Sequence, residues 1–118
     1  MTKVLFVDDS AFVRGRTVAL LKELGYAVVE ANDGAQAVEV FKRTRPDVVL
    51  LDITMPVMDG LEALREILAL DPDARVAMVT AAGQQKIVME AVKAGARDFV
   101  VKPFEPERLK ATLEMLLN

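Results

Sequence analysis

Apolar residues occur along the chain in short continuous runs, and each run is followed by a longer segment with apolar positions at helical spacing. Continuous apolar runs, in contrast to alternating ones, are typical of strands buried on both faces of a parallel sheet. The runs predict strands over residues 4–7, 26–29, 48–51, 76–79 and 99–101. The run that begins at Tyr26 is the weakest of them.

The segments between the runs predict helices over residues 11–24, 35–44, 59–70, 84–94 and 105–117. Gly25 and Gly95 follow the first and fourth of these segments, where a glycine commonly ends a helix. Several side chains of the first segment form pairs at helical spacing, namely Phe12, Val13, Leu20, Leu21 and Leu24. In the fourth segment we expect a buried stripe made of Ile87, Val88, Ala91 and Val92. Lys86, Met89, Glu90 and Lys93 should then point outward.

Strand and helix therefore alternate five times along the sequence. Because strand–helix–strand crossovers are almost always right-handed, this order predicts a doubly wound α/β fold with helices on both faces of one parallel sheet. We find no linker, repeat or low-complexity segment, so we expect one domain over residues 1–118. The last predicted helix reaches the last residues, and we expect no attached output domain.

Composition narrows the possible chemistry. The chain has 118 residues, 53% of them hydrophobic, which suits one domain with a substantial core. It has no Cys and no His, which excludes disulfides, thiolate or imidazole metal ligands, and Ser-His-Asp catalysis. A net charge of -3 argues against nucleic acid as the main partner. No signal peptide or membrane-spanning stretch is visible, so we expect a cytoplasmic protein.

Polar residues with useful chemistry follow four of the predicted strands. They are Asp8 and Asp9, Asp52, Thr80, and Lys102. Each has a structural interpretation when taken alone, since the first two acids can cap a helix and the others can be ordinary loop or surface residues. However, the carboxyl ends of parallel strands form the usual ligand site of open α/β sheets, so we expect all of them to meet in one crevice.

Three carboxylates in one crevice repel each other and need a cation to stay together. Oxygen ligands without nitrogen or sulfur favour Mg²⁺ or Mn²⁺, and Mg²⁺ usually combines one or two carboxylates with a phosphate oxygen. A carboxylate can also attack phosphorus to give an aspartyl phosphate. Lys102 and the Thr80 hydroxyl would then contact the phosphoryl oxygens, with small Ala81 and Ala82 leaving room for entry.

The same residues carry a family resemblance across the whole chain. The motifs are Val7-Asp8-Asp9-Ser10, Leu51-Asp52-Ile53-Thr54-Met55-Pro56 with Asp59-Gly60, Thr80-Ala81, Gly95-Ala96-Arg97-Asp98-Phe99 and Val101-Lys102-Pro103-Phe104. In this order and spacing they resemble the receiver domain of two-component response regulators, in particular its single-domain, CheY-like chemotaxis members. Gly83-Gln84-Gln85 resembles the thermophilic and Gram-positive members of that group.

This resemblance implies a flavodoxin-like (βα)5 fold with strand order 2-1-3-4-5, and it implies roles for individual residues. Asp52 would be the phosphoacceptor, and Thr80 and Lys102 would contact the phosphoryl group. Asp8, Asp9 and Asp52 would bind Mg²⁺ together with the backbone carbonyl of Thr54. Phe99 matches the switch aromatic of the family, which is often Tyr. The resemblance also favours a cis bond between Lys102 and Pro103.

The function implied is a phosphorylation-dependent switch, not an enzyme that acts on a separate metabolite. A CheA-like histidine kinase would donate the phosphoryl group, and the face formed by residues 84–94, 97–101 and 105–117 would bind a partner, here the flagellar motor switch protein. A phosphatase is a possible further partner, with no role for nucleic acid or membrane. We expect a monomer.

Other functions remain as alternatives. A phosphorelay intermediate that passes the group to another protein's His would have the same site. A small Mg²⁺-dependent phosphatase typically has a second Asp two residues past its nucleophile, where this chain has Thr54, and it needs a cap for which the chain lacks length. In a flavodoxin the first loop must bind the flavin phosphate, which Asp8 and Asp9 would repel.

Overall fold

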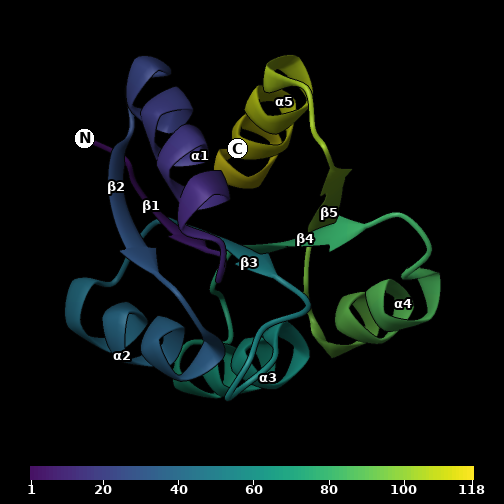
Figure 1. Ribbon diagram of the computed structural model, residues 1–118. Coiled ribbons are helices and arrows are strands. Elements are labelled where there is room, and N and C mark those ends of the chain that lie inside the picture. The colour runs from purple at the N-terminus through teal and green to yellow at the C-terminus, as the bar shows by residue number, and fades with distance from the viewer.

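Five parallel strands form one sheet, and helices cover both of its faces (Figure 1). The computed structural model describes residues 1–118. The strands are β1 (Lys3–Val7), β2 (Ala27–Ala31), β3 (Val48–Asp52), β4 (Val76–Ala81) and β5 (Asp98–Lys102). The helices are α1 (Ala11–Glu23), α2 (Gly34–Thr44), α3 (Gly60–Leu70), α4 (Gln85–Ala94) and α5 (Pro106–Leu117). All predicted elements are confirmed, although β2 starts and ends later than the predicted 26–29.

The strand order is β2-β1-β3-β4-β5, which confirms the doubly wound, flavodoxin-like fold. Helices α1 and α5 lie on one face of the sheet, and α2, α3 and α4 lie on the other (Figure 1). Alternate residues of each central strand therefore enter two separate cores: Leu5 and Val7 pack with the three-helix side, whereas Val4 and Phe6 pack with α1 and α5. This two-sided burial explains why the strands are continuous apolar runs. None of the helices has both the length and the apolar character needed to cross a membrane.

Short polar side chains begin the first three helices. Ser10 accepts a hydrogen bond from the backbone N–H of Val13, and Asp33 and Asp59 make the equivalent contact at α2 and α3. At the end of α4, Gly95 has a φ of 124°, which a residue with a side chain rarely adopts. The predicted glycine stop is therefore confirmed there.

Exposed apolar side chains occur on two helices. Phe12 is 70% exposed, because it lies nine residues before the buried Leu21 and hence about two and a half turns away, on the opposite side of α1. The expected buried stripe of α4 is wrong in part. In α4 only Val88 and Ala91 are buried, while Ile87 and Val92 are 37% and 46% exposed. Helix α4 packs mainly against β4 and α3, so the flanks of its apolar stripe stay uncovered. Met89 is exposed as predicted.

Candidate functional site

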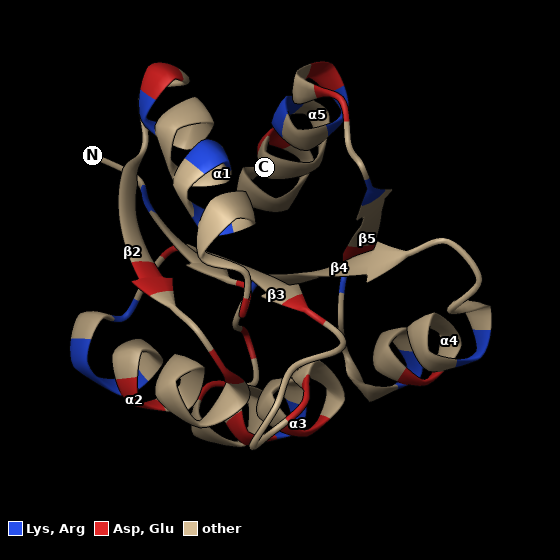
Figure 2. Ribbon diagram, in the orientation of Figure 1, with Lys and Arg blue, Asp and Glu red and all other residues tan.

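The register of the sheet brings the predicted polar residues to one edge. Parallel pairing sets Val7 beside Leu51, Asp52 beside Val79, and Ala81 beside Lys102. The carboxyl ends of β1, β3, β4 and β5 therefore lie at the same level. Asp8 and Asp9 follow β1 directly, and Asp52, Thr80 and Lys102 lie at the carboxyl ends of β3, β4 and β5. The ribbon is red at the end of β3 and blue at the end of β5 (Figure 2).

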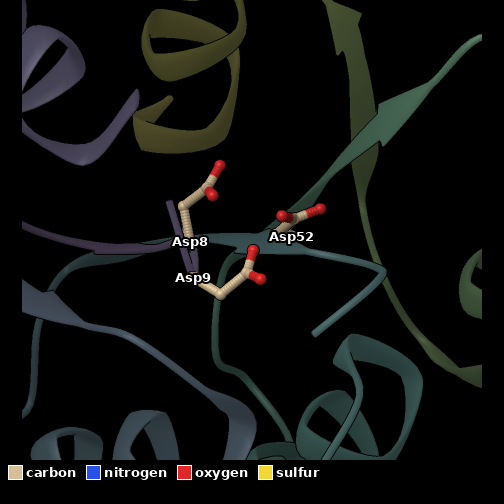
Figure 3. Close-up of side chains that lie close together, drawn as sticks. All are labelled: Asp8, Asp9 and Asp52. Carbon is tan, nitrogen blue, oxygen red and sulfur yellow. The ribbon is translucent and has the colours of Figure 1, made fainter. Parts of the chain in front are cut away.

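Asp8, Asp9 and Asp52 form an acidic cluster, with one carboxylate oxygen of each within 4.8 Å of the others (Figure 3). Asp8 and Asp52 are buried, whereas Asp9 is exposed and makes the cluster accessible from solvent. Carboxylates this close repel one another, and the repulsion is relieved by a cation. The donor set consists of oxygen alone, so the cluster fits a hard metal ion such as Mg²⁺.

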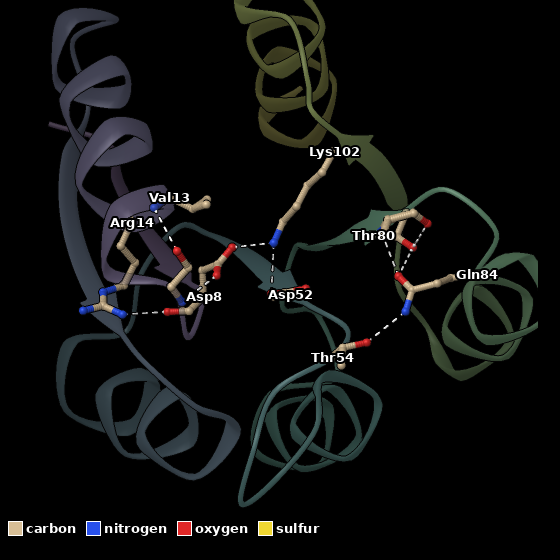
Figure 4. A network of polar contacts seen from close by, with 10 residues as sticks. Asp8, Val13, Arg14, Asp52, Thr54, Thr80, Gln84 and Lys102 are labelled. Atoms are coloured by element: carbon tan, nitrogen blue, oxygen red, sulfur yellow. Dashed lines mark hydrogen bonds and ion pairs between the residues drawn. The ribbon is translucent and has the colours of Figure 1, made fainter.

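Lys102 crosses from β5 to the two buried acids. Its Nζ atom lies 2.7 Å from Asp8 Oδ2 and 3.1 Å from Asp52 Oδ2 (Figure 4). The other oxygen of Asp8 accepts a hydrogen bond from the backbone N–H of Ser10, and Arg14 donates to the Asp8 carbonyl. Ser10, and not the acid pair, caps α1 through its side chain, so neither Asp8 nor Asp9 is explained by helix capping.

Burial raises the pKa of Asp52 above its ordinary value, and the charge of Asp8 raises it further. The charge and hydrogen bond of Lys102, and the backbone N–H of Thr54, offset part of this rise. Burial alone would lower the pKa of Lys102, but its contacts with Asp8 and Asp52 outweigh burial and hold it above the ordinary value. Lys102 therefore stays protonated between two buried acids, Asp8 and Asp52.

Thr80 lies at the same edge, but its hydroxyl faces a neighbouring loop. The side chain is buried, and Oγ1 lies 2.7 Å from Gln84 Oε1 and 3.1 Å from the Ala81 carbonyl oxygen. The amide nitrogen of Gln84 in turn donates to Thr54 Oγ1 at 2.8 Å (Figure 4). In the sequence, Gln84 was recognised only as part of a family-like motif, and no role was predicted for it. A contact between residues 54 and 84 cannot be predicted from their spacing in the sequence.

Phe99 of β5 lines the same pocket as Thr80. Its side chain is 37% exposed and lines a largely apolar pocket of about 430 Å³ beside Thr80, Val88 and Met89. The pocket opens between β4, β5 and the start of α4. Phe99 therefore borders open space on the side of Thr80.

The loop between β3 and α3 is held closely over the site. The N–H of Gly60 donates to the Ile53 carbonyl at 2.8 Å. Within the loop, the N–H of Met58 donates to the Pro56 carbonyl at 2.7 Å, which forms a three-residue turn around Val57. Val57 has a φ of 68°. On the other side of the site, the bond between Lys102 and Pro103 is cis, as predicted.

Comparison with known proteins identifies the family to which this arrangement belongs. A family model described as the response regulator receiver domain matches residues 4–114, nearly the whole chain. The chain is a response regulator receiver domain. The strand order, the acidic cluster and Lys102 of this receiver domain agree with the resemblance seen in its motifs.

Relatives of similar length support the assignment. The receiver domain is 52% identical over 119 residues to Protein CcdB of Bacillus subtilis, covering 100% of this chain and 99% of that protein. It is 48% identical over 112 residues to the chemotaxis protein CheY of Thermotoga maritima, covering 94% and 93%. Among solved structures, a CheX–CheY–BeF3–Mg²⁺ complex from Borrelia burgdorferi matches with a TM-score of 0.93 and 34% identity, covering 99% and 90%. The receiver domain is thus CheY-like in sequence and in fold.

Proposed function

We propose that this receiver domain accepts a phosphoryl group on Asp52 and changes its partner-binding face in response. The observation that carries the proposal is the position of Asp52, whose carboxylate belongs to the acidic cluster and also contacts the ammonium of Lys102. In the reaction, a carboxylate oxygen of Asp52 forms a bond to phosphorus while the bond between phosphorus and the donor breaks. The donor is a phosphohistidine of a CheA-like histidine kinase, whose neutral imidazole leaves.

Asp8, Asp9, Asp52 and the backbone carbonyl of Thr54 would hold Mg²⁺, whose charge offsets that of the phosphoryl oxygens. Lys102 already contacts Asp52 and stays charged, so its ammonium is positioned to bind a phosphoryl oxygen. The Thr80 hydroxyl donates a further hydrogen bond after it turns toward Asp52. These groups assist the domain's own phosphorylation, so we propose a signalling switch and not an enzyme with a separate substrate.

The response would travel from Thr80 to Phe99. When Thr80 turns toward the phosphoryl group, the pocket beside it can admit the Phe99 ring, which alters the face formed by α4, β5 and α5. A ligand shifts such an equilibrium only through contacts that differ between the two states, and Thr80 and Lys102 provide them. CheY-named relatives favour the flagellar motor switch as the partner, and the CheX–CheY neighbour supports a second protein partner.

Labelling with a small acyl phosphate and Mg²⁺ tests the proposed acceptor. Intact-mass analysis should show one added phosphoryl group on the wild type without any kinase, and none on Asp52→Ala. Asp73→Asn, which changes an exposed loop acid far from the cluster, serves as the matched control and should be labelled at the wild-type rate. Equal labelling of Asp52→Ala and the wild type would falsify the assignment. A panel of purified histidine kinases then identifies the donor.

Nuclear magnetic resonance tests the switch. Adding the phosphate mimic beryllofluoride to the Mg²⁺ form should shift amide signals over residues 84–101 as well as around Asp52. Thr80→Ala should still be labelled by acyl phosphate but should transmit less of the change to Phe99. Shifts that stop at the loops around Asp9 and Asp52 would contradict coupling to this face.

A further inference from the structure

The Gln84 side chain bridges two loops at the phosphorylation site. Its Oε1 atom accepts hydrogen bonds from Thr80 Oγ1 and from the Ala81 N–H, both at 2.7 Å, and its Nε2 atom donates to Thr54 Oγ1 at 2.8 Å (Figure 4). Gln84 is the residue before α4, yet its side chain makes no capping hydrogen bond to that helix. The side chain instead folds back over the β4–α4 loop, where Gly83, with a φ of 92°, lets the chain turn.

While the Thr80 hydroxyl donates its hydrogen bond to Gln84, it cannot donate one to a phosphoryl oxygen on Asp52. A hydroxyl has a single proton to donate, and the Thr80 proton is directed to Gln84 or to the adjacent Ala81 carbonyl. Thr80 is 2% exposed, so water does not readily replace either partner. To bind a phosphoryl oxygen on Asp52, Thr80 must first release Gln84. The two hydrogen bonds therefore belong to two different states of the site.

Releasing Thr80 leaves no polar atom of Gln84 stranded. Its Oε1 atom keeps the Ala81 N–H, and its Nε2 atom lies beside Thr54 at the exposed side of the site. The cost of the change is thus close to that of one hydrogen bond, which alters an equilibrium constant by about three- to tenfold. A contact of this size is strong enough to bias the resting state and weak enough for a phosphoryl group to displace it.

We propose that Gln84 is a positioning residue that holds Thr80 in the resting arrangement and thereby lowers the affinity of the site for a phosphoryl group. The inference rests on the proposed role of Asp52. Because Gln84 immediately precedes α4, its contact with Thr80 joins the phosphorylation site to the start of the helix that borders the Phe99 pocket. Gln84 thus links the occupancy of the site to the first turn of the responding face.

The adjacent residue provides a matched control. Gln85 has the same side chain and is exposed, and that side chain makes no hydrogen bond within the protein. Gln84→Ala removes the bridge without removing a helix cap, and Gln85→Ala removes an equal number of atoms without removing a bridge. A difference between the two variants therefore reports the bridge and not the mere loss of a side-chain amide at the start of α4.

The experiment measures beryllofluoride affinity at saturating Mg²⁺, by fluorine resonance of the bound anion, with Mg²⁺ affinity measured separately. Gln84→Ala should bind beryllofluoride about three- to tenfold more tightly than the wild type, since one hydrogen bond no longer competes. Its Mg²⁺ affinity, and both affinities of Gln85→Ala, should be unchanged. Equal or weaker beryllofluoride binding by Gln84→Ala would overturn the proposal.

A double-mutant cycle with Thr80→Ala separates positioning from loop stability. Without the Thr80 hydroxyl, Gln84→Ala should give no further gain in beryllofluoride affinity. A gain of the same size in both backgrounds would mean that Gln84 acts by another route and would overturn the proposal.

The results distinguish failure of the proposed function from failure of the proposed role of Gln84. If the wild type binds no beryllofluoride and Asp52 takes no label, the proposed function fails and the inference with it. If the wild type binds it and the variants do not differ, only the role of Gln84 is refuted.

Discussion

Gly60 packs directly against the backbone of Asp52. A Cβ atom at position 60 would overlap the Asp52 carbonyl oxygen and would lie 2.7 Å from the Ile53 Cα atom, far closer than such atoms approach. The hydrogen bond from the Gly60 N–H to the Ile53 carbonyl holds the two segments together. The start of α3 thus fixes the position of the proposed phosphoacceptor through backbone contact alone.

Gly60→Ala should therefore destabilise the fold by about 1–3 kcal/mol, because the backbone of Asp52 or of α3 must move. Urea denaturation measures the loss, and beryllofluoride binding should weaken as well. Gly15→Ala is the control: Gly15 lies inside α1, and a Cβ atom there would have no neighbouring atom within 4 Å, so the alanine should stabilise the protein by about 0.5–1 kcal/mol. Similar effects of both substitutions would contradict the close approach at Gly60.

Asp52→Asn should stabilise the metal-free protein at neutral pH. The pKa of Asp52 is raised by burial and by Asp8, so its ionised form costs stability; the cost is full above the folded-state pKa, shrinks as the pH falls below it, and is absent below the ordinary value of 3.8. Asparagine at position 52 removes the buried charge, and Lys102 still forms its ion pair with Asp8. We therefore expect the free energy of unfolding to rise by an amount on the order of 1 kcal/mol. Thermal unfolding should show this gain shrinking at acid pH. Mg²⁺ should stabilise the wild type more than the variant; the reverse order would refute the proposed metal site.

Lys102 should make the protein's stability depend on pH in the alkaline range. Its pKa in the folded state is above the ordinary 10.5, so its stabilisation is fully present below 10.5 and is lost as the pH rises through the folded-state value. Lys102→Met should lose about 2–3 kcal/mol at neutral pH without Mg²⁺, since Asp8 and Asp52 then lack their cation. The variant should also show a shallower alkaline decline than the wild type.

Tyr26 provides the control for that measurement. Burial, and secondarily the charge of Glu114, raises the pKa of Tyr26 above 10.0, so its ionisation also destabilises the folded state at high pH. Tyr26→Phe removes this contribution and leaves that of Lys102. If the alkaline decline disappears in Tyr26→Phe and persists unchanged in Lys102→Met, Lys102 is not its source.

Val57→Gly should stabilise the protein. Val57 has a φ of 68° in the turn closed by Pro56 and Met58, a conformation that a β-branched residue adopts only under strain of about 1–3 kcal/mol. Its side chain is 84% exposed, so no packing is lost. After the entropic cost of glycine, about 0.5–1 kcal/mol, a net gain of about 1 kcal/mol should appear in chemical denaturation. Val57→Ala keeps a Cβ atom and should gain less; an unchanged or lower stability of the glycine variant would argue against strain at this turn.

The fold was predictable because its central strands are buried on both faces. Runs such as Val48–Leu51 can be recognised without knowing which side chains face which helices, and their order with the helices limits the topology to few choices. The helix faces were less predictable, since hydrophobicity alone does not say how far a neighbouring element extends. Phe12 and Val92 are apolar and exposed because no neighbouring helix or strand covers their side of α1 or α4; the Phe12 ring is approached by Arg16 of its own helix.

Part of the candidate site could also be predicted from the order of the strands. Asp8, Asp52 and Lys102 could be placed together because each ends a strand, and the edge of a parallel sheet collects such ends. The direction of the Thr80 hydroxyl could not be predicted, because it depends on a side chain from the next loop. Gln84 reaches Thr54 across 30 positions of sequence, and only the three-dimensional path of both loops brings these residues together.

The separation of the two edges of the sheet also has a consequence for protein engineering. The site residues follow the strands, while the turns at the opposite edge, such as the one through Pro72 and Asp73, only reconnect helices to strands. Both residues are exposed, and exposed turns of this kind accept inserted peptides most readily. A reporter or affinity module could therefore be grafted there, leaving the signalling chemistry at the far edge undisturbed.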